Sequence, residues 1–346
     1  MKMNEKLIFY NKKYIKEQKN IIRNKYIRGC AKIFNFYPVA KKYDGFPVLN
    51  RFDTNEMIST LIDSNQPFAV CRFGSTELFN LTYFHMKNIA KMDPKTNVWA
   101  MSHYGTGYLE DEYSFALNSL TINSGFFPKS EEYLEQFYNL YVNLIPDVDL
   151  LGTWNIYLEK FFLDSYMKST KITNLYYLEP WFSNNPWSAH LAGKKVLVIH
   201  PFEQTIIQQY ENNRQNIFKD KNVLPEFELK TLKAIQTIAN NKDDRFNNWF
   251  EALDYMYNKA MTIDFDIAII GCGAYGMPLA LKLKRAGKQA IHLGGATQLM
   301  FGIKGSRWEQ SNYPTKIGKY FNEYWVRPSD NDKVQGQEKV EDSCYW

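Results

Sequence analysis

The sequence predicts an α/β protein with a Rossmann-like, mostly parallel sheet, helices on both faces, and a basic amphipathic N-terminal helix. Strand-like apolar runs alternate with helical patterns, which is typical of such a sheet. The stretch DFDIAIIGCGAYGMPLALKLKRAGKQAIHLGG reads as strand, glycine turn, helix and strand. The 45% apolar content of the 346 residues supports a real core. We expect a helical extension at 1–45, one domain at 46–326, and a polar tail at 327–346 over the surface.

The elements follow one another with short turns. YDGFPVLNRFD is predicted as a loop, and TNEMISTLIDSNQ as a helix with a Thr or Asn cap. PFAVCRFGSTELFNL reads as strand, turn and helix, while VDLLGTW and NLYYLEPW read as strands around the helix IYLEKFFLDSYMK. The strands KKVLVIHP and FELKTLKAI are each followed by a helix, FEQTIIQQYENNRQNIF and FNNWFEALDYMYNKAM. This alternation continues into the glycine-containing stretch.

The glycine turn matches G-x-G-x-x-G at Gly271, Gly273 and Gly276. Two interpretations stay open: the turn and the following helix start hold a phosphate, or the glycines only permit tight strand-to-helix packing. A dinucleotide site would place an acidic residue near the end of the second strand. The chain has no Asp or Glu between Asp266 and Glu309, which argues against NAD and favours another anionic ligand.

Ligands of open parallel sheets bind beyond the carboxyl ends of the strands. Six loops are predicted at that edge, and we expect them to form one cleft. They are RFGSTE at 72–77, GTWN at 152–155, EPWF at 179–182, HPFEQ at 200–204, GCGAYG at 271–276 and GGATQ at 294–298.

The net charge of +5 is unevenly distributed. Residues 1–43 carry twelve Lys or Arg against Glu5 and Glu17, about +10, and their apolar residues recur in pairs at helical spacing. Docking or dimerisation, and contact of residues 1–36 with an anionic membrane, are the open interpretations. Nucleic-acid binding is disfavoured because no nucleic-acid fold accompanies the segment. The scattered cysteines and the lack of a bilayer-spanning run indicate free thiols in the cytoplasm.

The first strand ends in RFGSTE, with Arg72 at the strand end and Glu77 in the first helical turn. One interpretation is structural, since a carboxylate at a helix start is favourable with the helix dipole. The other is functional: Arg72 grips a phosphate in its planar fork, and Glu77 binds a metal or a sugar hydroxyl.

RFGSTE resembles the R-F-G-D-x-E signature of the GT-D-type glycosyltransferases, a bacterial family first known as a domain of unknown function. The segment from DIAIIGCGAYG to GGATQ resembles the second half of that family, so the resemblance covers roughly residues 50–310. It implies a nucleotide-sugar donor, a UDP-sugar by preference, and a divalent metal at Asp-x-Glu. Ser75 stands in place of the Asp, and a hydroxyl is a poor ligand for Mg²⁺ or Mn²⁺ beside one carboxylate. We therefore expect weak or absent metal dependence at Glu77.

Glycosyl transfer also needs a held diphosphate, charge relief on it and a base for the acceptor hydroxyl, which indicates further candidate residues. Candidate catalytic residues are Glu77, Glu309 and Glu203, with His103 as a further candidate base. Candidate donor-binding residues are Arg72, Gly74, Ser75, Gly271, Gly273, Ala274, Tyr275, Gly276, Gly294, Gly295, Lys304 and Arg307. Candidate acceptor-binding residues are Trp154, Trp181 and His103, since aromatic rings and polar edges suit sugars.

The implied acceptor is a glycan or lipid-linked glycan of bacterial surface polysaccharide, which would put the protein at the inner face of the membrane, with a homodimer also open. Three alternatives to glycosyl transfer remain: another transferase acting on polysaccharide, a nucleotide-sugar-binding relative without catalysis, and an NAD(P)-dependent oxidoreductase.

Overall fold

The structure is a computed structural model that describes residues 42–43, 46–92, 108–154, 156, 159–309, 317–340 and 343–346. Side chains of 42–43, 86–92 and 108–114 are not part of the description. The predicted basic helix and His103 lie outside the described residues, so both stay predictions. No helix in the described chain combines the length and apolar character that crossing a membrane requires.

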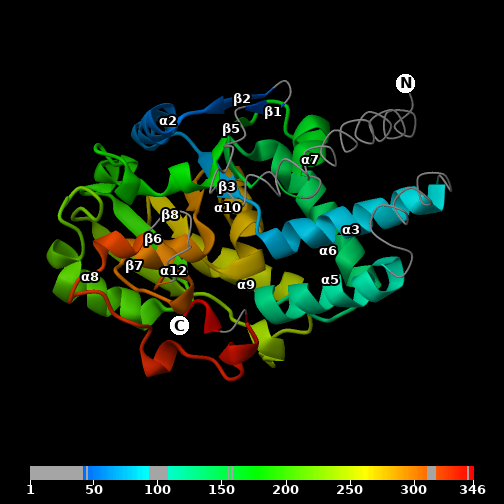
Figure 1. Cartoon of the computed structure of the whole chain (residues 1–346). Coiled ribbons are helices and arrows are strands. Elements are labelled where there is room, and N and C mark those ends of the chain that lie inside the picture. The colour runs from blue at the N-terminus through cyan, green and yellow to red at the C-terminus, as the bar shows by residue number, and fades with distance from the viewer. Residues whose placement is uncertain are drawn as a thin grey trace, which may run out of the picture.

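The predicted mostly parallel sheet is confirmed (Figure 1). In the described chain, eight parallel strands lie in the order β2-β5-β4-β3-β9-β8-β6-β7, and β1 (Lys42–Tyr43) pairs antiparallel with β2. The parallel strands are β2 (Phe46–Leu49), β3 (Phe68–Arg72), β4 (Leu150–Thr153), β5 (Lys171–Asn174), β6 (Lys195–His200), β7 (Glu228–Lys233), β8 (Ile267–Ile270) and β9 (Gln289–His292).

Two apolar cores cover the two faces of the sheet, because successive strand side chains point to opposite faces. In β3, Ala69 and Cys71 join one core, while Phe68 and Val70 join the other. The first core packs against α3 (Ser75–Met92), α5 (Tyr108–Ser124), α6 (Glu131–Leu144), α7 (Glu159–Tyr166), α9 (Trp249–Met261) and α10 (Gly276–Arg285). The second packs against α2 (Arg51–Asp63), α8 (Glu203–Ile217), α11 (Thr297–Met300) and α12 (Ser306–Glu309).

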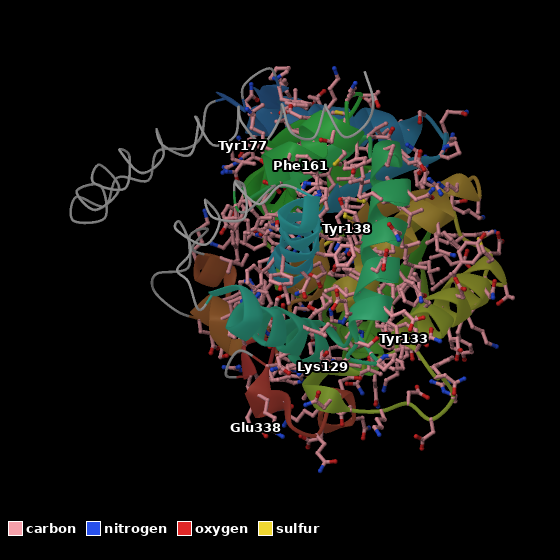
Figure 2. All side chains as sticks on the ribbon, turned by 90° about the vertical axis from the view of Figure 1, so that its right-hand side faces the viewer. Lys129, Tyr133, Tyr138, Phe161, Tyr177 and Glu338 are labelled. Atoms are coloured by element: carbon pink, nitrogen blue, oxygen red, sulfur yellow. The ribbon has the colours of Figure 1, made fainter. Side chains whose placement is uncertain are left out.

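Aromatic side chains fill much of the first core, as Figure 2 shows from the side of α3, α5 and α6. His85 of α3 lies between Tyr138 of α6, whose hydroxyl is 2.9 Å from His85 Nδ1, and Phe161 of α7, whose ring centroid is 4.0 Å away. Burial lowers the pKa of His85 to about 3, so the ring is neutral and packs as part of the core.

Two predicted elements differ in the structure. Phe46–Leu49, predicted within a loop, forms β2 at the sheet edge. NLYYLEPW is not a strand: β5 ends at Asn174, and residues Leu175–Leu178 form the 3₁₀ helix η2. The Asn174 side chain accepts a hydrogen bond from the Tyr176 N–H at 3.0 Å, which caps η2 and ends the strand. Leu175 and Leu178 then lie three residues apart on one side, both buried.

The tail was expected to lie over the surface, and this is wrong for its last residues. Trp346 is only 6% exposed and packs on Phe202 at the start of α8, with ring centroids 5.7 Å apart. The Ser306 N–H donates to the Trp346 carbonyl at 3.1 Å. Because Val340 and Trp346 bury apolar area against the second core, the segment packs inward despite its polar neighbours.

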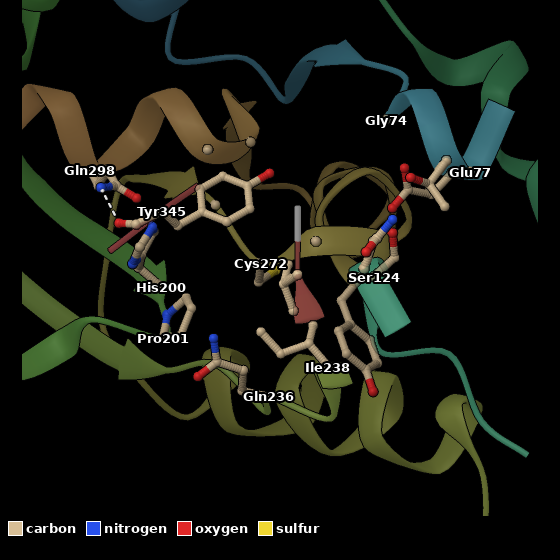
Figure 3. Close-up of a pocket in the computed structure, with 18 of the residues that line it drawn as sticks. Gly74, Glu77, Ser124, His200, Pro201, Gln236, Ile238, Cys272, Gln298 and Tyr345 are labelled. Carbon is tan, nitrogen blue, oxygen red and sulfur yellow. Dashed lines mark hydrogen bonds between the residues drawn. The ribbon is translucent and has the colours of Figure 1, made fainter. Parts of the chain in front are cut away.

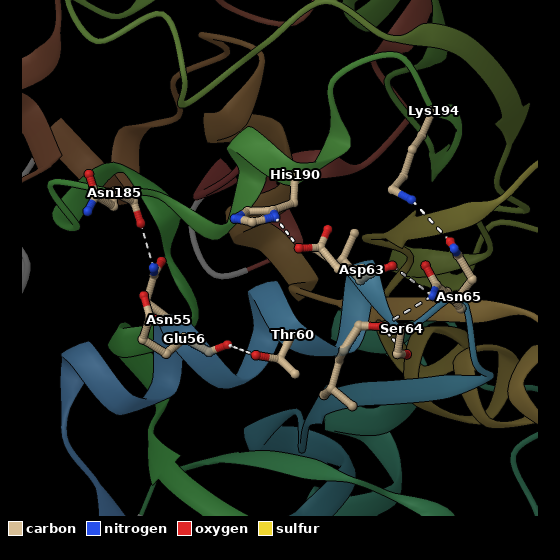
Figure 4. A network of polar contacts seen from close by, with 12 residues as sticks. Asn55, Glu56, Thr60, Asp63, Ser64, Asn65, Asn185, His190 and Lys194 are labelled. Atoms are coloured by element: carbon tan, nitrogen blue, oxygen red, sulfur yellow. Dashed lines mark hydrogen bonds and ion pairs between the residues drawn. The ribbon is translucent and has the colours of Figure 1, made fainter.

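Helix α2 is anchored on the second face by side-chain hydrogen bonds (Figure 4). Asn55 donates through Nδ2 to the Asn185 carbonyl and accepts through Oδ1 from the Trp187 N–H at 2.7 Å. It is 4% exposed. Asp63 at the end of the helix pairs with His190 at 2.8 Å. These contacts fix α2 against the 3₁₀ helix η4 (Trp187–Leu191).

We predict that Asn55→Ala lowers the free energy of unfolding by about 1–3 kcal/mol, because it leaves the buried Trp187 N–H without an acceptor. Urea denaturation measures the change. Thr60→Ala is the control, since Thr60 only donates to the Glu56 carbonyl on the exposed surface of the same helix. Equal stability of the two variants would contradict the anchoring role.

Candidate functional site

Two adjoining cavities lie at the carboxyl ends of the strands. The main cavity is lined by parts of five predicted loops and by the end of α5 (Figure 3), and the second cavity borders η2 and Glu179. They enclose about 1000 and 920 Å³ of space, part of it open solvent, within the range of ligand clefts. Arg72, Ser75, Trp154, Gly295 and Arg307 border both cavities. All six predicted loops contribute residues to one cavity or the other.

The crevice arises where neighbouring strands send their connections to opposite faces. β3 pairs in parallel with β9. β3 continues into α3 on the first face, whereas β9 continues into α11 on the second. The chain therefore diverges beyond the two strand ends and leaves a crevice there, the usual place for a ligand in an open parallel sheet.

Arg72, at the end of β3, is held in a fixed position between the cavities. Its Nε donates to the Phe73 carbonyl at 3.1 Å, and its guanidinium lies 4.6 Å from the centre of the Trp154 ring. Trp154 is anchored in turn, since its indole N–H donates to the same carbonyl at 2.7 Å. Gly294 has a φ of +62°, and a Cβ there would lie 3.0 Å from the guanidinium, so glycine makes room for Arg72.

Arg307, in α12, is held by the C-terminal segment. Its guanidinium lies 4.7 Å from the centre of the Tyr345 ring and donates to the Tyr345 hydroxyl at 3.3 Å. The Arg307 N–H donates to the Cys344 carbonyl at 3.1 Å. Gln298 donates to the Tyr345 carbonyl at 3.1 Å, as Figure 3 shows. The tail therefore completes the wall of the main cavity.

Glu77 lies in the main cavity, at the start of α3 (Figure 3). It is 5% exposed, and within the described chain its carboxylate has no ion-pair partner. A Cβ at Gly74 would lie 1.5 Å from Glu77 Oε2, so glycine is required for the carboxylate to fold back over the turn. Ser75 also borders the cavity. The predicted constellation of Arg72, Gly74, Ser75 and Glu77 therefore surrounds one space.

The glycine turn serves close packing as well as the cavity. Gly271 and Gly273 line the main cavity, but a Cβ at Gly271 would lie 2.6 Å from the Gly294 carbonyl. Gly276 is outside both linings, and a Cβ there would lie 2.1 Å from the ring of His292. The packing interpretation therefore holds for Gly276. Gly271 and Gly273 combine packing with access to the cavity.

Two buried histidines of the main cavity were not predicted as site residues. His200, at the end of β6, accepts the Phe202 N–H through Nδ1 at 3.0 Å, which leaves the proton of the neutral ring on Nε2. His292, at the end of β9, has Nδ1 3.2 Å from the Ile270 carbonyl. Burial lowers the pKa of both to about 3, with Arg72 adding to the effect at His292. Both are neutral rings that offer hydrogen bonds to a ligand.

Several predicted site residues lie outside both linings. Glu309 forms ion pairs with Arg327 and with Lys304, the latter at 3.5 Å. Trp181 is 3% exposed and stacks on Phe218 in the second core, with centroids 6.1 Å apart. Glu203 lies in the first turn of α8.

Ala274 and Tyr275 of the glycine turn are largely structural. The Ala274 carbonyl accepts from the Tyr141 hydroxyl at 3.3 Å. Tyr275 borders the main cavity but is 2% exposed, and its ring stacks on Trp249 with centroids 4.9 Å apart. Its hydroxyl lies 3.2 Å from that of Thr237. Tyr275 is therefore part of the cavity wall and has little free ring surface on which to stack a base or sugar.

The side chains of RFGSTE that could coordinate a metal ion do not fit a bound divalent metal. Glu77 supplies one carboxylate, and Ser75 supplies a hydroxyl where the family pattern has a second carboxylate. No group of three or more His, Cys, Asp or Glu that could hold a metal occurs in the described chain. We therefore assign no step to a metal, and the expected weak metal dependence stays a prediction.

Glu179 is the acidic residue that the sequence analysis missed. It belongs to the predicted loop EPWF and lines the second cavity. The sequence offers little indication that Glu179 is a site residue, because the segment that contains it was predicted as a strand. With η2 in place of that strand, the residue turns toward Arg72 and the crevice.

Comparisons with known proteins give one structural match. No family model matches the chain, and no curated protein matches it. The chain is similar to a solved structure described as "the highly conserved domain of unknown function 1792", which "has a distinct glycosyltransferase fold". The match covers 80% of this chain and 98% of that one, with 12% identity and a TM-score of 0.33.

We predict that Gly276→Ala destabilises the protein by about 1–3 kcal/mol, because a methyl group would overlap the buried His292 ring. The clash outweighs the roughly 1 kcal/mol that alanine gains over glycine in a helix. Chemical denaturation measures the change. Gly318→Ala is the control, since its nearest new contact would be an ordinary 3.8 Å. A Gly276→Ala variant as stable as the parent would refute the close contact.

Proposed function

We propose that the protein is a glycosyltransferase that moves a sugar from a nucleoside diphosphate sugar, a UDP-sugar by preference, to a glycan hydroxyl. The observation that carries the proposal is the meeting of two cavities at Arg72 and Arg307. A transferase of this kind needs a donor site and an acceptor site joined at the leaving diphosphate. Two cavities with a shared pair of guanidinium groups supply that arrangement.

The diphosphate is proposed to bind at Arg72 and Arg307. A guanidinium offers a planar fork of donors that matches phosphate oxygens, and its charge does not depend on pH. The glycine turn at Gly273 borders the main cavity and lets the ligand approach the backbone there. The stack on Trp154 and the bond to Phe73 hold the Arg72 fork in place before the ligand arrives.

The reaction breaks the bond between the sugar anomeric carbon and the diphosphate oxygen. The electron pair leaves with the diphosphate, and Arg72 and Arg307 stabilise the added negative charge. Glu77 is proposed to accept a hydrogen bond from a hydroxyl of the donor sugar. Polar side chains of the same wall, including Ser124, Thr237 and Gln298, suit the remaining hydroxyls of the donor.

The acceptor class and the location are proposed from the resemblance and from the basic segment. A glycan or lipid-linked glycan of surface polysaccharide would be reached at an anionic membrane surface, where each cation of residues 1–36 contributes about 1 kcal/mol. The same segment is also suited to pairing in a homodimer.

We predict that the purified protein binds UDP, or another nucleoside diphosphate, and does not bind NADH. Calorimetry with UDP, GDP, CDP, their sugars and NADH measures this, and parallel runs with EDTA and Mn²⁺ should give similar affinities. Arg72→Met should weaken nucleotide binding at least about tenfold, since it removes charge-assisted hydrogen bonds. Arg245→Met is the control, because Arg245 pairs with Asp243 on the surface. Binding of NADH alone would overturn the proposal.

We predict that Glu77→Gln slows sugar transfer about 10- to 150-fold, the loss expected when a hydrogen bond to a charged group is weakened by about 1.5–3 kcal/mol. The fold should persist, because glutamine has the same shape. UDP release from the donor measures the rate. Glu132→Gln, in the first turn of α6, is the matched helix-start control. A Glu77→Gln rate within about threefold of the parent would assign Glu77 a structural role only.

A further inference from the structure

The second cavity has a mostly apolar wall with one buried carboxyl group. Leu175, Leu178 and Leu293 supply part of that wall, and Glu179 supplies the carboxyl. The side chain of Glu179 is buried, with the whole residue 6% exposed. Its Oε2 is buried, and no described residue donates a hydrogen bond to it.

The local backbone fixes the direction of Glu179. The residue precedes Pro180, and a residue before proline is restricted to extended conformations. Its backbone angles are φ −82° and ψ 113°, and it ends η2 by donating its N–H to the Tyr176 carbonyl at 3.4 Å. This turn places Glu179 beside the second cavity, which its side chain lines.

A buried carboxyl oxygen without a partner is costly for a fold, about 1–3 kcal/mol in mutational data. The second cavity provides the missing partner if it receives a ligand with a hydroxyl group, because a hydroxyl donates to a carboxylate. The cavity also borders Arg72 and Arg307, where the leaving diphosphate is proposed to bind.

We propose that the second cavity is the acceptor subsite and that Glu179 is the catalytic base for the acceptor hydroxyl. This inference rests on the proposed glycosyl transfer. The Glu179 carboxylate takes the proton of the hydroxyl, whose oxygen forms a bond to the anomeric carbon of the donor sugar. The bond from that carbon to the diphosphate breaks, and its electron pair leaves with the diphosphate between Arg72 and Arg307. Trp154, which borders both cavities, provides a flat apolar surface for the acceptor ring.

The charged groups around Glu179 predict the pH dependence of transfer. Burial raises the pKa of Glu179 to about 8, and the charge of Arg72, the nearby Trp181 indole and the charge of Arg51 only partly offset this. Tyr176 also faces the second cavity, but burial raises its pKa above the usual value of 10. The base form of Glu179 therefore becomes populated as pH rises through about 8. The rate of transfer should increase over the same interval and then level off.

The test uses the full chain and measures UDP release from UDP-sugars, with alkyl glycosides as probe acceptors, between pH 6 and 9.5. Glu179→Gln keeps the shape and cannot take a proton, so kcat should fall about 10²- to 10⁴-fold and the rise near pH 8 should disappear. The Kd for UDP should stay within about twofold. Glu226→Gln is the control, since Glu226 pairs with Arg214 at the surface, outside both cavities.

A Glu179→Gln variant with parental kcat and an unchanged pH profile would overturn the assignment, and so would equal losses of UDP binding and transfer. If that variant does not fold, Glu179→Asp should lower kcat and retain a rise with pH, and a parental kcat for it would overturn the assignment as well. Transfer by the parent protein with no rise near pH 8 would refute the base while leaving the proposed function intact. A parent protein that binds no nucleoside diphosphate would overturn both.

Discussion

The parallel pairing of β3 with β9 is the constraint on which the site depends. The two strands are more than 200 residues apart in the chain, yet Ala69 pairs with Ala290 and Val70 with Ile291. This register brings Arg72, at the end of β3, against Gly294, just beyond β9. The pairing of β3 with β9 joins the middle of the sheet. Because the two strands send their connections to opposite faces, a crevice remains beyond their carboxyl ends. The pairing of β3 with β9 therefore determines both the sheet and the place of the site.

The positive charge of the crevice comes from two arginines that aromatic rings support. Arg72 is half-buried and lies over Trp154, and Arg307 is held by Tyr345. Both guanidinium groups are supported by aromatic rings, which accept a cation on their faces and keep it partly desolvated. A desolvated cation interacts with a phosphate more strongly than a solvated one. The two neutral histidines add hydrogen-bonding groups without further charge.

The sequence was sufficient to predict the parallel sheet, the position of the crevice and the grouping of Arg72, Gly74 and Glu77. These depend on local patterns, such as apolar strands that end in polar loops. Side-chain direction depends on tertiary packing and was harder to predict. Trp181 and Glu179 lie two residues apart in one loop, but the tryptophan enters the second core and the carboxyl faces the second cavity. Glu309 was a candidate base in the sequence, but Lys304 before it and Arg327 after it both hold it in ion pairs. The tail was judged polar by composition, although a few apolar residues decide where it packs.

The central claim is that Arg72 and Arg307 together bind the diphosphate of a donor at the junction of the two cavities. A crystal structure of the protein with UDP tests it most directly. We expect the phosphates to lie within hydrogen-bond distance of both guanidinium groups, and the uridine to extend into the main cavity while the second cavity stays free for an acceptor. UDP bound away from both arginines, or with its uridine filling the second cavity beside Glu179, would contradict it.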